Sequence, residues 1–511
     1  MAAPTVSPSP PALSSSPVLD DLASRAMRVL WAWPALLTLL AGCYQLTGPE
    51  LWRDELSSWS FASRPVPELV TIVHHSDATQ LGYYLLLHYW MALFGDSVIA
   101  MRLLSVLAMA AAAACLTLAG RRIAGERAGL LAGLIFALVP SVSRFAQETR
   151  FYALEVLVAM LATLLLLRAI DRPVIGRWVA YGASMAVLGY VDLVALCLLA
   201  GHAAGVALYW WRDRDRRLFW FGPAAAAASA ACLPIALVGL GQAGQQLVWL
   251  PRPGLSLSVF SFFGRNLFYS TAAAAALIIV AVFAWAVSWR AAAFVTAIAV
   301  LPVAVVWLVS QGQYSYFFPR YLLLTVGAWA LLAGLALSRL DIRAAAAGVL
   351  VFAVLGAGDQ VVIRERGAHN WPAYPANSNT DYWDYAGAAS VIARYARAGD
   401  GITYPGAPIR WEMIDYGVRY YLDRALPAAR IPREVFVART AAEAGTLYPV
   451  LCSDAAACLG STPRMWIVGT QYSKNPYARI PTDEAAQMRA HYRVTMTRRV
   501  SGLRIYLLVR T

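Results

Sequence analysis

The chain has 511 residues, of which 59% are hydrophobic and only 14% are charged. Soluble domains carry roughly a quarter charged residues, so the composition excludes a chain built from soluble domains alone. The apolar residues form long runs, which predict a polytopic α-helical membrane protein. The net charge of +13 comes mostly from arginines in short loops between these runs. Membrane topology explains that pattern better than a nucleic-acid partner does.

Residues 1–25 are rich in Ser, Pro and Ala and predict a disordered cytoplasmic tail. The next run, from Met27 to Gln45, has no small-residue cleavage site followed by soluble sequence, so we expect a retained transmembrane helix and not a signal peptide. Later apolar runs bring the expected number of spans to about eleven. They lie near residues 97–119, 128–145, 151–169, 177–191, 192–211, 218–240, 271–288, 291–310, 320–338 and 343–358.

These spans define a transmembrane module over residues 26–358, with a first external loop at 46–80. Segment 81–94 is short for a span and rich in aromatic residues, which favours an in-plane helix at the membrane surface.

Arginines indicate the orientation of the module. They cluster at residues 121–127, 168–177, 212–217, 290 and 339–343, all on the side of the N-terminus if the expected spans are correct. The positive-inside rule makes that side cytoplasmic. An odd number of spans then places the C-terminus outside. We therefore expect a multi-pass protein of the cytoplasmic membrane.

Residues 359–511 are polar and contain no further spanning run. Segment 391–395 predicts a helix, and segments 402–404, 465–469 and 504–509 predict strands. We expect a soluble extracytoplasmic α/β domain here. Outside the cytoplasm, Cys452 and Cys458 could form a local disulfide, and two cysteines without a nearby His are weak evidence for zinc.

The first external loop contains two adjacent acids, Asp54 and Glu55, flanked by tryptophans. Ionised groups beside a bilayer need water, a partner or a function. A solvated turn or the start of an in-plane helix would account for them structurally. The same loop also carries His74, His75 and Asp77, and several titratable groups in one loop favour an assembled site. The two histidines beside Asp77 could ligate a divalent metal, although adjacent histidines converge poorly.

Several arginines on the expected outer side run against the positive-inside rule. They are Arg144, Arg150, Arg252, Arg265 and Arg320. Their usual explanation is pairing with an acid, a lipid headgroup or a phosphate, and the planar guanidinium suits phosphate oxygens. A structural ion pair, for example Glu148 with Arg150, is the alternative for about half of them. For Arg320, at the start of a helix after several aromatic residues, ligand binding is preferred.

Four motifs in this order resemble the GT-C superfamily of integral-membrane glycosyltransferases, and in particular its protein-mannosyltransferase-like and aminoarabinose-transferase-like branch. The motifs are Asp54–Glu55; a block with His75, Asp77, Tyr83–Trp90 and Phe94–Gly95; Gln147–Leu154; and Arg320–Leu323. Two positions depart from the pattern. Gln80–Leu81–Gly82 stands where many relatives have Pro-Pro, and Asp192 replaces a histidine. Asp192 is either a second acidic site residue or a local structural one.

The resemblance implies transfer of a sugar from a polyprenyl-phosphate carrier to an acceptor hydroxyl on a lipid, glycan or protein at the outer membrane face. Asp54 would act as general base with support from Glu55, while Arg320 and Arg150 would hold the departing phosphate. The motifs also supply candidate substrate-binding residues: His74, His75, Asp77, Tyr83, Tyr84, Gln147, Tyr152 and Tyr321. No nucleotide is needed, and a divalent metal is possible. The competing class is a transporter or lipid flippase, for which internal repeats would be expected.

Overall fold

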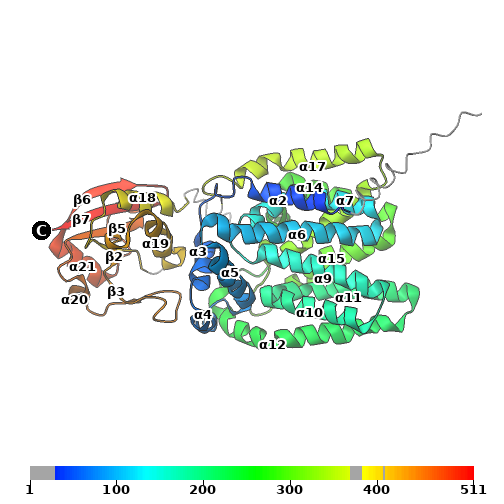
Figure 1. The fold of residues 1–511 in the computed structure, drawn as a ribbon, viewed down its shortest axis with the longest axis horizontal. Coiled ribbons are helices and arrows are strands. Elements are labelled where there is room, and N and C mark those ends of the chain that lie inside the picture. Colours follow the sequence, from blue (N-terminus) through cyan, green and yellow to red (C-terminus); the bar gives the residue numbers. More distant parts are fainter. Residues whose placement is uncertain (1–28, 369–381, 407–408) are drawn as a thin grey trace, which may run out of the picture.

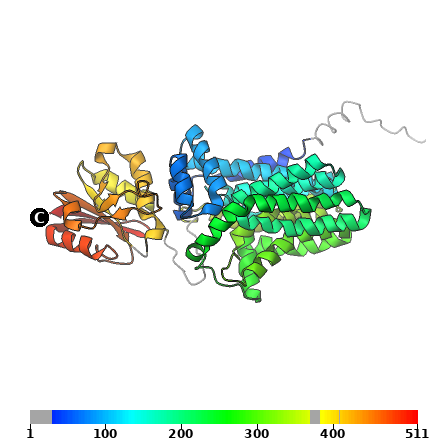
Figure 2. The same ribbon diagram turned by 90° about the horizontal axis from the view of Figure 1, so that it is seen from below.

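The computed structural model describes residues 29–368, 382–406 and 409–511. It contains a helical bundle and a smaller mixed domain at one end of that bundle (Figures 1 and 2). The described residues include seven helices that are long and apolar enough to cross a membrane, or up to nine if two bent pairs each form one span. The predicted fold class, a polytopic helical membrane protein with a C-terminal α/β domain, is confirmed. The predicted tail over residues 1–25 lies outside the described residues.

A helix occupies each of the predicted spans. Two of these helices, α2 with 12 residues and α10 with 17, are short, so fewer than eleven of the described helices pass as full spans. The helices of the bundle are α2 (Ala32–Cys43), α6 (Val98–Ala124), α7 (Glu126–Leu138), α8 (Pro140–Ala146), α9 (Tyr152–Asp171), α10 (Ile175–Val191), η2 (Leu193–Cys197), α11 (Leu198–Asp213), η3 (Arg216–Trp220), α12 (Phe221–Gln246), α13 (Leu257–Phe268), α14 (Thr271–Val287), α15 (Trp289–Val309), η4 (Pro319–Thr325), α16 (Val326–Leu337) and α17 (Ile342–Val362).

Two segments differ from the expected single elements. The run at 128–145 is broken at Val139, which is extended because the residue before a proline avoids the helical region, and α7 and α8 therefore meet at 65°. The stretch at 241–270, expected to be a loop, contains α13. Tyr269, with a φ of 55°, ends α13, and Ser270 then caps α14, which starts at 100° to it.

Small residues allow the central helices to approach closely. A side chain at Gly129 would lie 2.4 Å from the carbonyl oxygen of Thr117 on α6, and one at Gly334 would lie 2.6 Å from the amide nitrogen of Ala132. Such glycines are typical of helix contacts within membranes. The close contacts of α7 with α6 and α16 rest on these glycines.

Four short helices lie between the bundle and the C-terminal domain (Figure 1): α3 (Arg53–Ala62), α4 (Val66–Val73), η1 (Ala78–Gln80) and α5 (Leu81–Phe94). The predicted external loop at 46–80 is thus largely helical. Helix α5 covers the segment 81–94 that was expected to be a helix. Its in-plane orientation remains a prediction.

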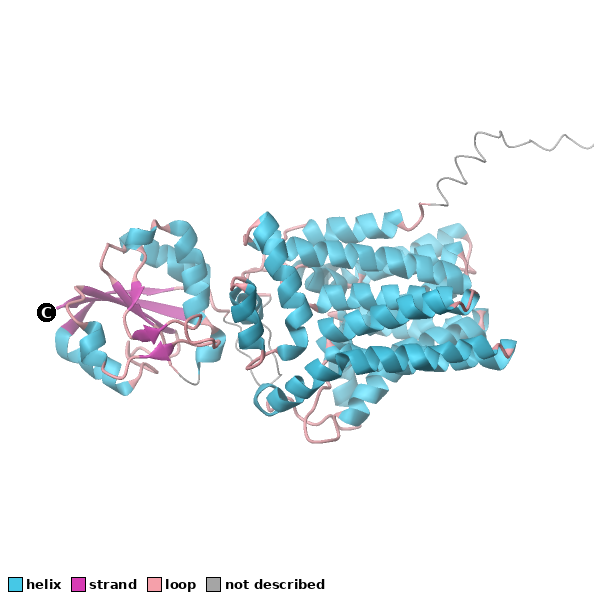
Figure 3. Cartoon of the chain, turned by 60° about the horizontal axis from the view of Figure 1, so that its bottom comes forward, coloured by secondary structure: helices cyan, strands magenta, loops and turns pink. Residues whose placement is uncertain are grey.

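The C-terminal domain has a five-stranded sheet in the order β2-β1-β5-β7-β6, with helices on both faces (Figure 3). Strand β1 pairs in parallel with β2 and β5, and β7 pairs antiparallel with β5 and β6. Along β5, Trp466 faces the core shared with α18 and α19, whereas Met465 and Ile467 face the opposite core. Successive side chains of a strand point to opposite faces of the sheet, so this alternation shows that β5 is buried on both faces. The elements are α18 (Tyr385–Tyr395), β1 (Gly401–Thr403), η5 (Ile409–Glu412), α19 (Ile414–Ala425), η6 (Ala428–Arg430), β2 (Arg433–Glu434), β3 (Val437–Arg439), β4 (Val450–Leu451), α20 (Ala455–Leu459), β5 (Arg464–Thr470), α21 (Thr482–His491), β6 (Tyr492–Arg499) and β7 (Leu503–Arg510).

Cys452 and Cys458 form a disulfide beside α20. The predicted domain boundary at 358/359 falls inside α17, which continues to Val362. The limits of the soluble domain therefore remain a prediction.

The C-terminal domain contacts the outer helices through specific polar groups. The buried Arg64 guanidinium donates to the carbonyl oxygens of Ala441 at 3.3 Å and Thr446 at 2.8 Å. Asp96 pairs with Arg424 at 2.6 Å, and its carbonyl accepts a hydrogen bond from Tyr420 at 2.8 Å. These contacts fix the domain against α3 and the end of α5, next to the site described below.

Candidate active site

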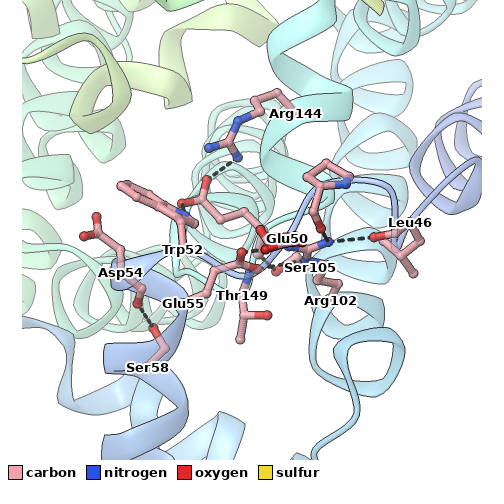
Figure 4. A network of polar contacts seen from close by, with 12 residues as sticks. Leu46, Glu50, Trp52, Asp54, Glu55, Ser58, Arg102, Ser105, Arg144 and Thr149 are labelled. Atoms are coloured by element: carbon pink, nitrogen blue, oxygen red, sulfur yellow. Dashed lines mark hydrogen bonds and ion pairs between the residues drawn. The ribbon is translucent and has the colours of Figure 1, made fainter. Parts of the chain in front are cut away.

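Asp54 and Glu55 lie in the first turn of α3, where their side chains point away from one another (Figure 4). A helix start favours negative charge because unpaired backbone N–H groups point outward there. Asp54 lines a cavity of about 680 Å³, whereas Glu55 is fully buried and does not line it. The two adjacent acids therefore have different surroundings.

Three arginines surround the carboxylate of Asp54. Its Oδ2 lies 3.2 Å from Nη1 of Arg320, and its Oδ1 lies 3.5 Å from Nε of Arg53. Burial acts to raise the pKa of Asp54, but the charges of Arg320, Arg150 and Arg53 outweigh it and lower that pKa. Asp54 is therefore an ionised carboxylate at neutral pH. It can accept a proton.

Glu55 is held by Arg102 of α6 in a bidentate ion pair. Arg102 Nε lies 2.9 Å from Oε1 and Nη2 lies 2.8 Å from Oε2, and the Thr149 amide also donates to Oε1 at 2.9 Å. Arg102 further donates to the carbonyl oxygens of Leu46 and Pro49. A buried charge needs such complete pairing. The predicted support from Glu55 is therefore indirect, through the placement of α3.

Glu148 belongs to a neighbouring buried cluster with Arg144 and Trp52. Its Oε2 lies 2.6 Å from Arg144 Nη1, and its Oε1 accepts a hydrogen bond from the Trp52 indole at 3.0 Å. The ion pair of Glu148 with Arg150 given as an example above is therefore wrong, because Arg144 is one helical turn before Glu148 and points the same way. This pairing leaves Arg150 available to the cavity.

Arg150 lies in the cavity wall beside a tyrosine and a second acid. Its Nη1 donates to the hydroxyls of Tyr84 at 3.2 Å and Ser58 at 3.3 Å, and Tyr84 in turn donates to Oδ2 of Asp77 at 3.0 Å. Asp77 lines the cavity as well. Burial raises the pKa of Asp77, and Arg150 and the Tyr84 hydrogen bond offset only part of that effect. The Nε of Arg150 is buried and has no hydrogen-bond partner among the described residues.

Arg320 is the second residue of η4 and lies among aromatic rings. Its guanidinium carbon is 5.6 Å from the ring centre of Trp52, 5.7 Å from that of Tyr152 and 5.7 Å from that of Tyr321. The Arg320 Nε is also buried, and no group in the described part of the chain accepts a hydrogen bond from it. Fixed guanidinium groups with spare donors are suited to a phosphate.

The cavity has three kinds of wall. Asp54, Arg150 and Arg320 form its charged part. Small and apolar residues of α12 form a second part, including Ala236, Gly239, Leu240 and Ala243. The C-terminal domain supplies the third part with Trp411, Met413, Leu447 and Tyr448. A ligand with a phosphate, an apolar tail and a polar reacting group would match all three walls.

The structure brings together some of the predicted site residues and leaves others outside. Asp54, Asp77, Arg150, Arg320 and Tyr321 line the cavity, and Tyr84 contacts it through Asp77 and Arg150. Tyr83 and Tyr152 are buried and do not line it.

Gln147 donates instead to the carbonyl oxygens of Gly42 and Tyr44. His74 and His75 are exposed at the end of α4 and lie outside the cavity wall. The described part of the chain contains no group of three His, Cys, Asp or Glu that could hold a metal ion. Asp192 lines the cavity and also caps η2 by accepting from the Val194 amide, so both interpretations of this residue apply.

Sequence reasoning missed Arg53, Arg102 and the cavity residues of the C-terminal domain. Arg102 carried a signal, because an arginine inside an apolar helix requires a buried partner. Trp411 and Tyr448 carried none, since they lie more than 350 residues from Asp54 in the sequence.

Comparison with known proteins identifies relatives of this fold. Residues 79–238 match the family model of dolichyl-phosphate-mannose-protein mannosyltransferases. No curated protein sequence matches the chain. ArnT from Cupriavidus metallidurans bound to undecaprenyl phosphate is similar in structure with a TM-score of 0.56 and 15% identity, over 96% of this chain and 98% of that one. Its apo state gives a TM-score of 0.58 and 16% identity, over 95% of this chain and 98% of that one.

The arabinofuranosyltransferase AftD from Mycobacteria is also similar, with a TM-score of 0.51 and 15% identity over 96% of this chain and 40% of the longer AftD chain. The chain thus has the GT-C fold, as the motif resemblance predicted. It is a multi-pass membrane protein of that type.

Proposed function

We propose that this protein is a glycosyltransferase that moves a sugar from a polyprenyl-phosphate carrier to an acceptor hydroxyl at the outer face of the cytoplasmic membrane. The observation that carries the proposal is the pairing of Asp54 with Arg320 at 3.2 Å in a cavity that also has an apolar wall. The matching family model and the similarity to ArnT bound to undecaprenyl phosphate support the same substrate class.

The proposed reaction is a displacement at the anomeric carbon of the donor sugar. The acceptor oxygen forms the new bond to that carbon while the bond between the carbon and the phosphate oxygen breaks. Asp54, kept ionised by its arginine neighbours, takes the proton of the acceptor hydroxyl. The polyprenyl phosphate leaves with the bonding electron pair. The activated donor supplies the driving force, so no nucleotide takes part.

Arg320 and Arg150 have the chemistry to bind the departing phosphate. Each has a buried Nε that forms no hydrogen bond within the part of the chain that the structure describes, and both line the same cavity as Asp54. Positive charge fixed before the reaction stabilises an anion that develops during it, because no reorganisation is needed. The apolar wall of α12 would take the first isoprene units of the carrier.

We further propose that the N-terminus is cytoplasmic and that the C-terminal domain lies outside. The arginine-rich turns, for example those at Arg121 and Arg212, support this orientation through the positive-inside rule. The disulfide between Cys452 and Cys458 supports it as well, because disulfides persist in oxidising compartments.

The direct test compares Asp54→Asn with the unmodified protein in proteoliposomes supplied with a panel of radiolabelled undecaprenyl-phosphate sugars and extracted envelope acceptors. Loss of the general base should reduce transfer by about 10²–10⁴-fold. Asp213→Asn, at an exposed acid on α11, is the matched control and should transfer normally. Full transfer by Asp54→Asn would overturn the mechanism. Movement of the lipid across the bilayer without a covalent product would favour the transporter class.

A further inference from the structure

We propose that Trp411 of the C-terminal domain is the stacking platform for a carbohydrate acceptor, and that Arg53 positions this platform beside Asp54. The inference rests on the proposed function and extends it from the donor to the chemical class of the acceptor. It assigns a role in substrate recognition to the C-terminal domain.

The first argument is the exposure of Trp411 within the cavity. Trp411 retains 50% of its accessible surface although it lines the same cavity as Asp54. A large indole left half open in a cavity is typical of a ligand contact, since burial of an aromatic ring is otherwise strongly favourable.

The second argument is that Trp411 is fixed in place. The guanidinium carbon of Arg53 lies 3.9 Å from the centre of the Trp411 ring system, a close cation–π contact. Arg53 also lies 3.7 Å from Oε2 of Glu412 and 3.5 Å from Oδ1 of Asp54. One arginine thus joins the indole to the proposed base.

The backbone beneath Trp411 is anchored as well. The hydroxyl of the fully buried Tyr385 donates to the carbonyl oxygen of Glu412 at 2.6 Å. This bond ties η5 to the core between α18 and the sheet. The indole therefore rests on a rigid element, as a binding platform requires.

The third argument is the division of the cavity. The lipid donor has its apolar wall on α12 and its phosphate arginines at residues 150 and 320. The acceptor must then approach Asp54 from the remaining side, which is formed by the C-terminal domain. A sugar ring has an apolar C–H face and a rim of hydroxyls. That shape fits an indole face with Glu412, Arg53 and Tyr448 close by.

The test uses full-length protein in nanodiscs and three measurements: the Kd of undecaprenyl phosphate, release of the donor sugar to water, and transfer to envelope glycans and glycolipids extracted from cells that lack the protein. Trp411→Ala should raise the acceptor KM and reduce transfer about tenfold or more, as for loss of an aromatic anchor. The Kd of undecaprenyl phosphate and the rate at which donor sugar is released to water should stay within about twofold of the wild-type values. Trp411→Phe should recover most of the transfer, and Tyr472→Ala, at an exposed aromatic outside the cavity, should change nothing.

Each other outcome has a defined meaning. Normal transfer by Trp411→Ala, or an equal loss of undecaprenyl-phosphate binding and transfer, would overturn the platform role. A label found by mass spectrometry on a protein acceptor would overturn the carbohydrate class while leaving the glycosyltransferase proposal intact. If wild-type protein neither transfers nor releases any donor sugar, the proposed function fails, and this inference fails with it.

Discussion

The carboxylates of Asp54 and Glu55 follow one another in the sequence but bind to different arginines. Asp54 lies 3.2 Å from Arg320 in the cavity, whereas Glu55 lies 2.8 Å from Arg102 in the packed interior. The helical turn at the start of α3 separates them, since successive side chains of a helix point in different directions. One acid can therefore serve the reaction while the other holds the helix.

Glu55→Ala should destabilise the fold, and Asp54→Asn should not. Removal of Glu55 leaves the buried Arg102 charge without its acid, which costs about 3–5 kcal/mol. The measurement is the thermal unfolding of the purified protein in detergent, with aggregation as the readout. The expected result is a clear loss of Tm for Glu55→Ala and a near wild-type Tm for Asp54→Asn. Equal thermal stability of the two variants would contradict the structural role of Glu55.

Arg320→Ala should reduce transfer about 10²–10³-fold, the usual effect of removing one fixed donor from a developing anion. Arg320→Lys should recover only part of the activity, because lysine keeps the charge but lacks the planar fork. Undecaprenyl-phosphate binding to the purified protein should weaken more in Arg320→Ala than in Arg320→Lys. Arg265→Ala, at an exposed arginine of α13, is the control. A larger effect of Arg265→Ala would place the phosphate elsewhere.

When the pH is lowered, transfer activity should be lost only at a pH below the range in which an aspartate usually titrates. This loss forms the acidic limb of the pH profile. Burial alone would raise the pKa of Asp54, but Arg320, Arg150 and Arg53 lower it. Arg53→Gln removes one of these charges, so the pKa of Asp54 rises and activity is lost at a higher pH on acidification. A profile of kcat/KM against pH for both proteins measures this change. If the acidic limb of Arg53→Gln lies at the same pH as that of the unmodified protein, or at a lower pH, the assignment of Asp54 as base is contradicted.

The titration of Glu50 should lower the free energy of unfolding as the pH rises. Burial and the nearby Asp384 raise the pKa of Glu50 from 4.5 to about 8, against the opposing effect of Arg366. The folded protein thus holds a proton that the unfolded chain releases above pH 4.5, and the associated stability is lost as the pH rises through about 8. Each tenfold difference in proton affinity between the folded and the unfolded state changes the free energy of unfolding by about 1.4 kcal/mol.

Glu50→Gln should flatten the fall in Tm between pH 5 and pH 8. Glu365→Gln, at an exposed acid on the same side of the bundle, should leave it unchanged. An unaltered pH dependence in Glu50→Gln would show that another group titrates.

Lys474 is the one lysine in the sequence and is exposed on the C-terminal domain. A membrane-impermeant amine reagent added to intact spheroplasts should therefore label it, if this domain lies outside. Lys474→Arg should abolish the labelling, and peptide mapping should place the label at residue 474. Labelling that appears only after lysis would reverse the proposed orientation.

The sequence predicted the membrane class, the spanning helices and three of the seven described strands, β1, β5 and β7, because hydrophobic runs and alternation are local signals. The proline after Val139 was a visible signal for the break between α7 and α8. Helix α13 was missed because its apolar residues are too few for a span. The sequence also pointed to Asp54 and Arg320, whose charges are unusual at their positions.

The partners of these charges were harder to predict. Arg144 and Arg150 are equally plausible neighbours of Glu148 by charge, and only the helical turn between Arg144 and Glu148 decides which one pairs. The contact between Arg53 and Trp411 joins two separately folded parts of the chain. No local pattern encodes such a contact, since it depends on how the C-terminal domain docks.

The five residues at 147–151, between α8 and α9, connect α3 and the residue before it to their surroundings. Gln147 bonds to the end of α2, Glu148 to Trp52, the Thr149 amide to Glu55, and Arg150 to Ser58 and Tyr84. Four successive residues thus each have a different fixed partner. Insertion or deletion of a single residue in this loop would shift these pairings by one place. We therefore expect related chains to keep both the number of residues in this loop and the side chains that make the pairings.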